Sequence, residues 1–175
     1  MPNFSCNISL LFTEFDITER FAAAARAGFR AVECQFPYNL DPTILRSQLT
    51  AHNLKLVLCN TPSGDLDSGE RGFAAIPGRE SDFTASLNTA LSFADHIGCP
   101  NLHVMAGVIP DNVDPEDCCE TFVGNLKRAA LQAAEKNIVL LIEPINNVDI
   151  PDYFLNYVDD AARIIEEVGE PNVRL

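Results

Sequence analysis

One carboxylate stands where parallel-sheet enzymes place their catalytic groups. Glu143 directly follows the apolar run Ile138–Ile142, and Pro144 comes after it. A side chain at the carboxyl end of a parallel strand faces the side of the sheet that carries active sites, and the proline stiffens the turn. Flanking apolar residues would partly desolvate the carboxylate and raise its pKa unless a cation compensates. Glu143 is therefore a candidate general base and metal ligand; the alternative is a glutamate that caps the next segment or pairs with a lysine.

The long segment from Asn60 to Arg79 is the second candidate, because loops longer than about 12 to 15 residues are commonly functional. It carries several glycines together with Arg71 and Arg79. An arginine on such a loop could clamp a substrate carboxylate through two parallel hydrogen bonds. The alternative is a surface salt bridge with a neighbouring glutamate, which explains Arg79 equally well and Arg71 less well.

Other polar side chains fall near the same predicted strand ends. Asn7 and Asn60 could each orient a substrate hydroxyl through the amide, or could bond a neighbouring loop backbone instead. His103 lies in the fourth predicted strand, where a lone histidine more often packs in the core than lines a site. With Asn146, three residues after Glu143, the candidate substrate-binding residues are Arg71, Asn60, His103, Asn7 and Asn146.

The elements that would position these residues alternate between short apolar runs and longer stretches of helical period. This alternation is typical of consecutive βα units around a parallel sheet. Asp41-Pro42 and Asp114-Pro115 each place a capping carboxylate before a proline at the first helical position. Strands are predicted over 4–10, 30–35, 54–59, 101–105 and 138–142, with the start of a sixth over 172–175. Helices are predicted from 17 to the break at Gly28 and over 42–53, 80–97, 115–135 and 157–168.

Two architectures fit this alternation. A doubly wound sheet of five or six strands could be complete at 175 residues, whereas a (β/α)₈ barrel takes about 250. The segment 7–12, which covers the end of the first predicted strand and the residues just after it, contains no glycine, so it cannot form a Gly-rich phosphate loop. We therefore favour the barrel and expect no nucleotide cofactor.

Composition excludes several classes of partner. Lys and Arg total 12 against 25 Asp and Glu, and the formal net charge of -13 repels phosphate backbones and anionic lipids. No apolar stretch approaches the roughly 18 residues of a membrane span, and the first residues do not resemble a signal peptide. Six cysteines without a C-x-x-C pair are expected to be reduced and to hold no zinc. We expect a cytoplasmic protein with no nucleic-acid or membrane partner.

Several stretches of the chain together resemble the hydroxypyruvate isomerase family. They occur in the family's order and extend over essentially the whole chain. They are Phe4-Ser5-Cys6-Asn7-Ile8-Ser9-Leu10-Leu11-Phe12, Ala27-Gly28-Phe29-Arg30-Ala31-Val32-Glu33, Phe36-Pro37-Tyr38, Asn60-Thr61-Pro62-Ser63-Gly64-Asp65, Gly69-Glu70-Arg71-Gly72, Ile76-Pro77-Gly78-Arg79-Glu80 and Leu141-Ile142-Glu143-Pro144-Ile145-Asn146.

The resemblance implies an α/β fold, a (β/α)₈ TIM barrel of the xylose isomerase-like type. Residues 1–175 would form a single, partial barrel domain with about the first five βα units and the start of strand six. It also implies that hydroxypyruvate and tartronate semialdehyde are interconverted through an enediolate by carboxylate acid/base catalysis. Glu143 matches the family's carboxylate on strand five, as acid/base and as a ligand of a divalent metal, Mg or Mn. The partner would be a small anionic hydroxy-keto acid, and a homo-oligomer is left open.

The family's second catalytic glutamate and other metal ligands come from later strands, beyond Leu175. We therefore expect a fragment or shortened isoform that is inactive in isolation. The nearest alternative function is a 2-oxo-tetronate isomerase, whose family has a stretch similar to His103-Val104-Met105-Ala106-Gly107. A related keto-sugar epimerase is more distant, and a non-catalytic binding isoform is the alternative from a different functional class.

Overall fold

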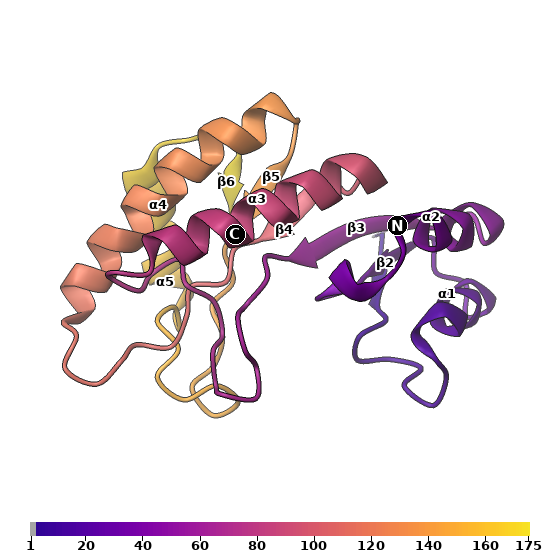
Figure 1. Cartoon of the computed structure of the whole chain (residues 1–175), viewed down its shortest axis with the longest axis horizontal. Coiled ribbons are helices and arrows are strands. Elements are labelled where there is room, and N and C mark those ends of the chain that lie inside the picture. The colour runs from indigo at the N-terminus through magenta and orange to yellow at the C-terminus, as the bar shows by residue number, and fades with distance from the viewer. Residues whose placement is uncertain (1–2) are drawn as a thin grey trace.

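The computed structural model describes residues 3–175 and contains a six-stranded sheet (Figure 1). The strands pair in chain order, and every neighbouring pair is parallel. They are β1 (Ser5–Asn7), β2 (Ala31–Glu33), β3 (Lys55–Asn60), β4 (Asn101–His103), β5 (Val139–Leu141) and β6 (Val173–Arg174). The helices are α1 (Ile17–Arg26), α2 (Pro42–Ala51), α3 (Glu80–Ile97), α4 (Pro115–Glu135) and α5 (Val158–Val168), with a short 3₁₀ helix η1 (Pro37–Asn39).

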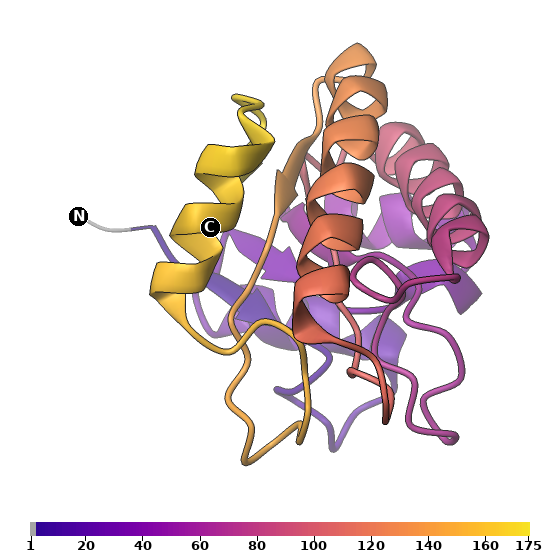
Figure 2. The same ribbon diagram turned by 90° about the vertical axis from the view of Figure 1, so that its left-hand side faces the viewer.

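The helices form one layer against the sheet, each packing on the next from α1 to α5 (Figures 1 and 2). Right-handed crossovers between strands that pair in chain order place every helix on the same face. A doubly wound sheet would instead reverse its strand order and carry helices on both faces. The observed order is therefore that of a (β/α) barrel, with the helices outside and a concave face inside.

The short strands alternate between these two faces. The central residues Cys6, Val32 and Leu140 are at most 1% exposed and pack towards the helices. Side chains point to opposite faces at successive strand positions, so the flanking residues face the concave side. Asn7 and Glu33, the last residues of β1 and β2, are register partners on that side.

Side-chain caps and left-handed glycines set several helix ends. The side chains of Asp41 and Asp114 accept hydrogen bonds from the second residue of α2 and α4, at 2.7 and 2.9 Å. Gly98 and Gly169 end α3 and α5 with φ values of 79° and 72°, which glycine adopts without steric cost. Because these signals are local, the helices begin and end within a residue or two of the predicted positions.

Most strands are shorter than predicted at their carboxyl ends, whereas β3 ends at Asn60, one residue later than predicted. β1 ends at Asn7 rather than at residue 10, because the Asn7 side chain turns the chain by accepting a hydrogen bond from the Ser9 backbone. β4 ends at His103, and Ala106 instead forms an isolated antiparallel bridge with Gly72 of the loop after β3. The loops after β3, β4 and β5 lie together at the bottom of Figure 1.

All six cysteines are free thiols. Five are buried, and Cys119 is half-buried in a groove between α4 and α5 that Arg163 and Glu167 also line. No helix within residues 3–175 is both long and apolar enough to cross a membrane.

Candidate active site

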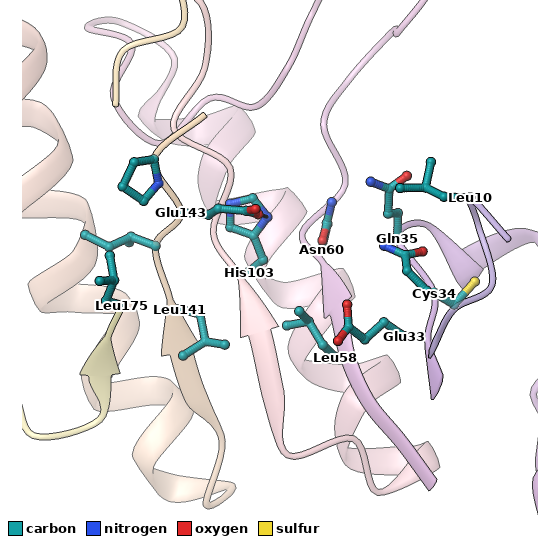
Figure 3. A pocket seen from close by; sticks show the side chains of 13 residues that line it. Leu10, Glu33, Cys34, Gln35, Leu58, Asn60, His103, Leu141, Glu143 and Leu175 are labelled. Atoms are coloured by element: carbon teal, nitrogen blue, oxygen red, sulfur yellow. Dashed lines mark ion pairs between the residues drawn. The ribbon is translucent and has the colours of Figure 1, made fainter. Parts of the chain in front are cut away.

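A cleft lies at the carboxyl ends of the strands, on the concave side of the sheet (Figure 3). It consists of two adjoining cavities of about 350 and 540 Å³. The residues that line both cavities are Leu10, Gln35, Asn60, His103, Glu143 and Pro144. Of the five predicted substrate-binding residues, Asn60 and His103 line both cavities, Asn7 lines the smaller, and Arg71 and Asn146 line the larger.

Glu143 is the second residue after β5 and extends from that strand towards His103 (Figure 3). Its side chain is 65% exposed and faces the cleft. Loss of hydration among the surrounding groups raises the pKa of its carboxyl, and the negative charge of Glu33 raises it further. A raised pKa makes the ionised carboxylate a stronger base and the protonated group a better stored proton for return to the substrate.

His103, the last residue of β4, contacts Glu143 from the floor of the cleft. Burial lowers its pKa to about 4, so the imidazole is neutral at pH 7. Its Nδ1 atom lies 3.5 Å from Oε2 of Glu143, a polar contact rather than an ion pair because the ring is uncharged. Its Nε2 atom is buried and has no hydrogen-bond partner among the described residues. Buried polar atoms are usually paired, so this atom indicates a missing partner such as water or a ligand.

Two asparagines end the strands beside these groups. Asn60, the last residue of β3, is 6% exposed, and its Nδ2 atom lies 3.7 Å from the Met105 sulfur, a weak contact. Its Oδ1 atom has no hydrogen-bond partner within residues 3–175 and can accept a hydrogen bond in the cleft. In Asn7 the oxygen is engaged by the Ser9 backbone at 3.0 Å. That is the backbone-bonding alternative, and it leaves only the Asn7 Nδ2 donor for the cleft.

Arg71 supplies the only cationic side chain among the described residues that line either cavity. Its Nη1 atom donates to the backbone oxygens of Leu66 and Glu70, at 2.9 and 2.7 Å. It forms no salt bridge with a carboxylate of the described residues, so its charge is available to an anion.

Arg79 forms a salt bridge with neighbouring acidic side chains, which was the alternative to substrate binding. Its guanidinium pairs with Glu70 at 2.9 Å and with Asp82, and it lies 4.5 Å from the centre of the Phe73 ring. It lines neither cavity, and its charge is already paired. Of the two arginines in the loop, only Arg71 remains a candidate for binding a substrate carboxylate.

Asn146 is placed less favourably than predicted. Its Nδ2 atom donates to Asp149 at 2.7 Å, and its oxygen accepts from the Val148 and Asp149 backbones. Both ends of the amide thus hold the turn after β5. Asn146 borders the larger cavity, but its polar atoms are already engaged.

Sequence reasoning did not single out Glu33. This last residue of β2 lines the smaller cavity, and its Oε1 atom accepts a hydrogen bond from the Ser5 hydroxyl. Figure 3 shows Glu33 and Glu143 pointing into the cleft from opposite sides. The predicted strand 30–35 placed Glu33 inside the strand, and the rule that selected Glu143, a carboxylate at the end of a parallel strand, applies to Glu33 only because β2 ends there.

The described residues do not by themselves fit a metal centre. No group of three or more His, Cys, Asp or Glu side chains within residues 3–175 is arranged to hold an ion. Glu143 offers carboxylate oxygens, but Mg²⁺ needs near-octahedral coordination. Any metal bound to Glu143 would therefore take its remaining ligands from elsewhere.

Comparison with known proteins decides the family. Residues 21–175 match the family model described as the xylose isomerase-like TIM barrel. The chain belongs to this family. Among relatives in the xylose isomerase-like family, 2-oxo-tetronate isomerase of Cupriavidus necator is 47% identical over 175 residues, which are 100% of this chain and 67% of that protein. Hydroxypyruvate isomerase of Escherichia coli is 40% identical over 100% of this chain and 68% of its own length. The resemblance to hydroxypyruvate isomerases is thus confirmed.

Solved structures of similar chains agree with the fold. The protein titled AP endonuclease, family 2, from Brucella melitensis superimposes with a TM-score of 0.95 at 42% identity, covering 99% of this chain and 67% of that one. A 3-keto-D-glucoside 4-epimerase from E. coli superimposes with a TM-score of 0.79 at 17% identity, over 98% of this chain and 66% of that one. At 17% identity, the similarity to the epimerase structure shows the fold alone. The chain spans about two thirds of the length of these relatives.

Proposed function

We propose that the protein is an aldose–ketose type isomerase that acts on a small hydroxy-keto acid, either hydroxypyruvate or 2-oxo-tetronate. The observation that carries this proposal is Glu143, a carboxylate of raised pKa that shares one cleft with the unpaired cation of Arg71. The relatives named 2-oxo-tetronate isomerase and hydroxypyruvate isomerase support the reaction class.

The proposed reaction moves one proton between two neighbouring carbons. Arg71 holds the substrate carboxylate at one end of the cleft. Glu143 removes the proton from C3, next to the C2 carbonyl, and the electron pair of the C–H bond forms the C2=C3 double bond of an enediolate. Glu143 then returns the proton to C2, while the C3 hydroxyl gives its own proton to the C2 oxygen, so that C3 becomes the carbonyl and C2 carries the hydroxyl. Substrate and product have the same atoms, so no oxidant or reductant is needed.

His103 and Asn60 supply neutral partners for the two oxygens that exchange roles. The uncharged imidazole has a buried Nε2 atom without a hydrogen-bond partner within residues 3–175, and the Asn60 amide is held by a weak contact of its Nδ2 atom with the Met105 sulfur. A neutral imidazole carries one donor nitrogen and one acceptor nitrogen, and an amide carries a donor nitrogen and an acceptor oxygen, so these two side chains can bind an oxygen either as a carbonyl or as a hydroxyl.

We further propose that a divalent cation, Mg or Mn, takes Glu143 as one of its ligands, as the resemblance implies. Such an ion would polarise the substrate carbonyl as a Lewis acid. Its other ligands would lie outside the described residues, and no step above depends on it. Calorimetric titration with Mn²⁺ tests this assignment: Glu143→Gln should weaken binding if Glu143 is a ligand.

Glu143→Gln tests the proposed acid/base role. The amide keeps the size of the side chain but cannot take a proton, so we expect turnover of either acid to fall by about 10²- to 10⁴-fold. Exchange of the C3 proton with solvent deuterium should fall equally, with substrate affinity largely retained. Both are measured by NMR on the full-length protein, with Glu135→Gln on the exposed surface of α4 as control. Proton exchange within tenfold of wild type in Glu143→Gln would contradict the role of Glu143.

We also propose a cytoplasmic location, without nucleic-acid or membrane partners. Six free thiols are common in a reducing compartment, and a net charge of -13 opposes binding to polyanions.

A further inference from the structure

The two ends of the cleft differ in chemistry. Arg71 lines only the larger cavity, whereas Asn7 and Glu33 line only the smaller one. Glu143 and His103 line both, so the proposed reaction centre lies between a cation and a carboxylate–amide pair. A substrate anchored by its carboxylate on Arg71 therefore points its other end towards Asn7 and Glu33.

Asn7 and Glu33 form a fixed pair. They are register partners at the ends of β1 and β2 and face the concave side of the sheet. The Ser5 hydroxyl donates to Oε1 of Glu33, and the Ser9 backbone donates to Oδ1 of Asn7. These contacts hold both side chains while leaving Oε2 of Glu33 as an acceptor and Nδ2 of Asn7 as a donor.

The free donor of Asn7 and the free acceptor of Glu33 together match the hydrogen-bonding groups of a hydroxyl. A hydroxyl donates one hydrogen bond and accepts others, so it can satisfy Glu33 and Asn7 together. A second carboxylate at this position would be repelled by Glu33, and a hydrogen or methyl group would leave both polar atoms unpaired. The smaller cavity, about 350 Å³, has room for such a group beyond Glu143.

Building on the proposed function, we propose that Asn7 and Glu33 form a hydroxyl subsite that selects four-carbon 2-oxo acids over three-carbon ones. With C1 on Arg71 and C2–C3 at Glu143, the hydroxymethyl C4 of 2-oxo-tetronate extends into this subsite. Hydroxypyruvate ends at C3 and leaves the subsite empty. Hydrogen bonds to a charged group can discriminate by about tenfold or more between ligands that have and lack the bonding hydroxyl.

Non-reacting acids test the subsite without depending on turnover. Erythronate and threonate carry four carbons and a terminal hydroxyl, glycerate carries three, and none has a carbonyl to isomerise. Calorimetric titration of the full-length protein should show tighter binding of at least one four-carbon acid than of glycerate. Glu33→Leu should remove most of this preference by weakening the binding of the four-carbon acid about tenfold. Glycerate should bind this variant as tightly as wild type or more tightly, because the negative charge of Glu33 no longer repels it.

Further variants guard against a folding defect and a general charge effect. Glu33→Gln retains one acceptor oxygen and should keep part of the preference; it replaces Glu33→Leu as the deciding variant if circular dichroism shows the latter unfolded. Glu135→Gln removes a charge on exposed α4 and should change nothing. Equal binding of three- and four-carbon acids by wild type, or equal weakening of both by the Glu33 variant, would overturn the subsite.

The same titrations separate this inference from the proposed function. Arg71→Gln should weaken all three acids alike, because each carries the carboxylate. If it does so while the Glu33 variants leave the preference unchanged, the subsite fails and the proposed function stands. If wild type binds none of the acids, both proposals fail.

Discussion

The His103 imidazole at the floor of the cleft is buried without charge, and this links its titration to the stability of the fold. Its pKa is about 4 in the folded protein against 6.5 for a free side chain. Between these values the unfolded chain binds a proton here that the folded chain does not. Stability from this group is therefore fully present above pH 6.5 and is lost as the pH falls towards 4.

Urea unfolding at pH 7.0 and pH 4.5 measures this effect. The free energy of unfolding of wild type should fall by about 2 kcal/mol more than that of His103→Asn over this interval, because asparagine does not titrate. His96→Asn, on the exposed side of α3, should behave like wild type. An identical loss in wild type and His103→Asn would show that His103 is protonated as easily in the folded protein as in solution.

At the scale of single residues, the location of a side chain at a strand end was easier to predict than the hydrogen bonds that the side chain makes. Glu143 was identifiable because a carboxylate after an apolar run must emerge at the strand end. The engagement of Asn146 in its turn was not foreseen, and for Asn7 the sequence left backbone bonding and substrate binding as alternatives, because both outcomes depend on loop backbones that no pattern specifies. Glu33 was missed because an alternating strand explains a polar residue equally well as facing solvent.

The loop between β3 and α3 depends on a close approach at Gly72. This glycine has φ of 110° and bridges to Ala106, and a Cβ atom here would overlap the backbone carbonyl of Met105. Gly69 in the same loop has φ of 91°, but a Cβ there would meet nothing within 4 Å. Both glycines therefore adopt a positive φ, and they differ in how closely other atoms surround the position that a Cβ atom would take.

Alanine at these two positions therefore makes a matched pair. Both substitutions should lower the free energy of unfolding by about 1–2 kcal/mol for the left-handed backbone. Gly72→Ala should lose about a further 1–3 kcal/mol because the overlap forces the loop away from Met105. It should also weaken binding of glycerate, since Arg71 is the preceding residue. Chemical denaturation compares the two variants, and equal losses would mean that the loop does not need the contact.

Among the elements, helices were predicted more closely than strands. The bounds of α3 match the predicted 80–97, since Gly98 ends the helix by its own conformation. Strand ends depend on where the neighbouring strand stops offering hydrogen bonds, which is a tertiary property. The short helix η1 was not predicted, because its three residues are too few for a periodic pattern.

At the scale of the whole molecule, periodicity predicted βα units but not their order in the sheet. A barrel and a doubly wound sheet both alternate strands with helices, and they differ in which strands pair. The absence of a Gly-rich loop after the first strand favoured the barrel, the resemblance to a known family implied it, and the family match and strand order confirm it. Within the described chain, β1 and β6 each have one neighbouring strand, so the concave face and the cleft open between them.

Because most of the cysteine thiols are buried, opening of the fold can be followed by covalent labelling of these thiols. With five cysteines buried and Cys119 half-buried, an aromatic disulfide reagent should modify about one thiol per native molecule and all six in denaturant. Prompt modification of two or more native thiols would contradict this. In Cys119→Ser, every remaining cysteine thiol would react only after the helices separate from the sheet. The rate of labelling in native buffer would then report how often this protein opens, without any denaturant.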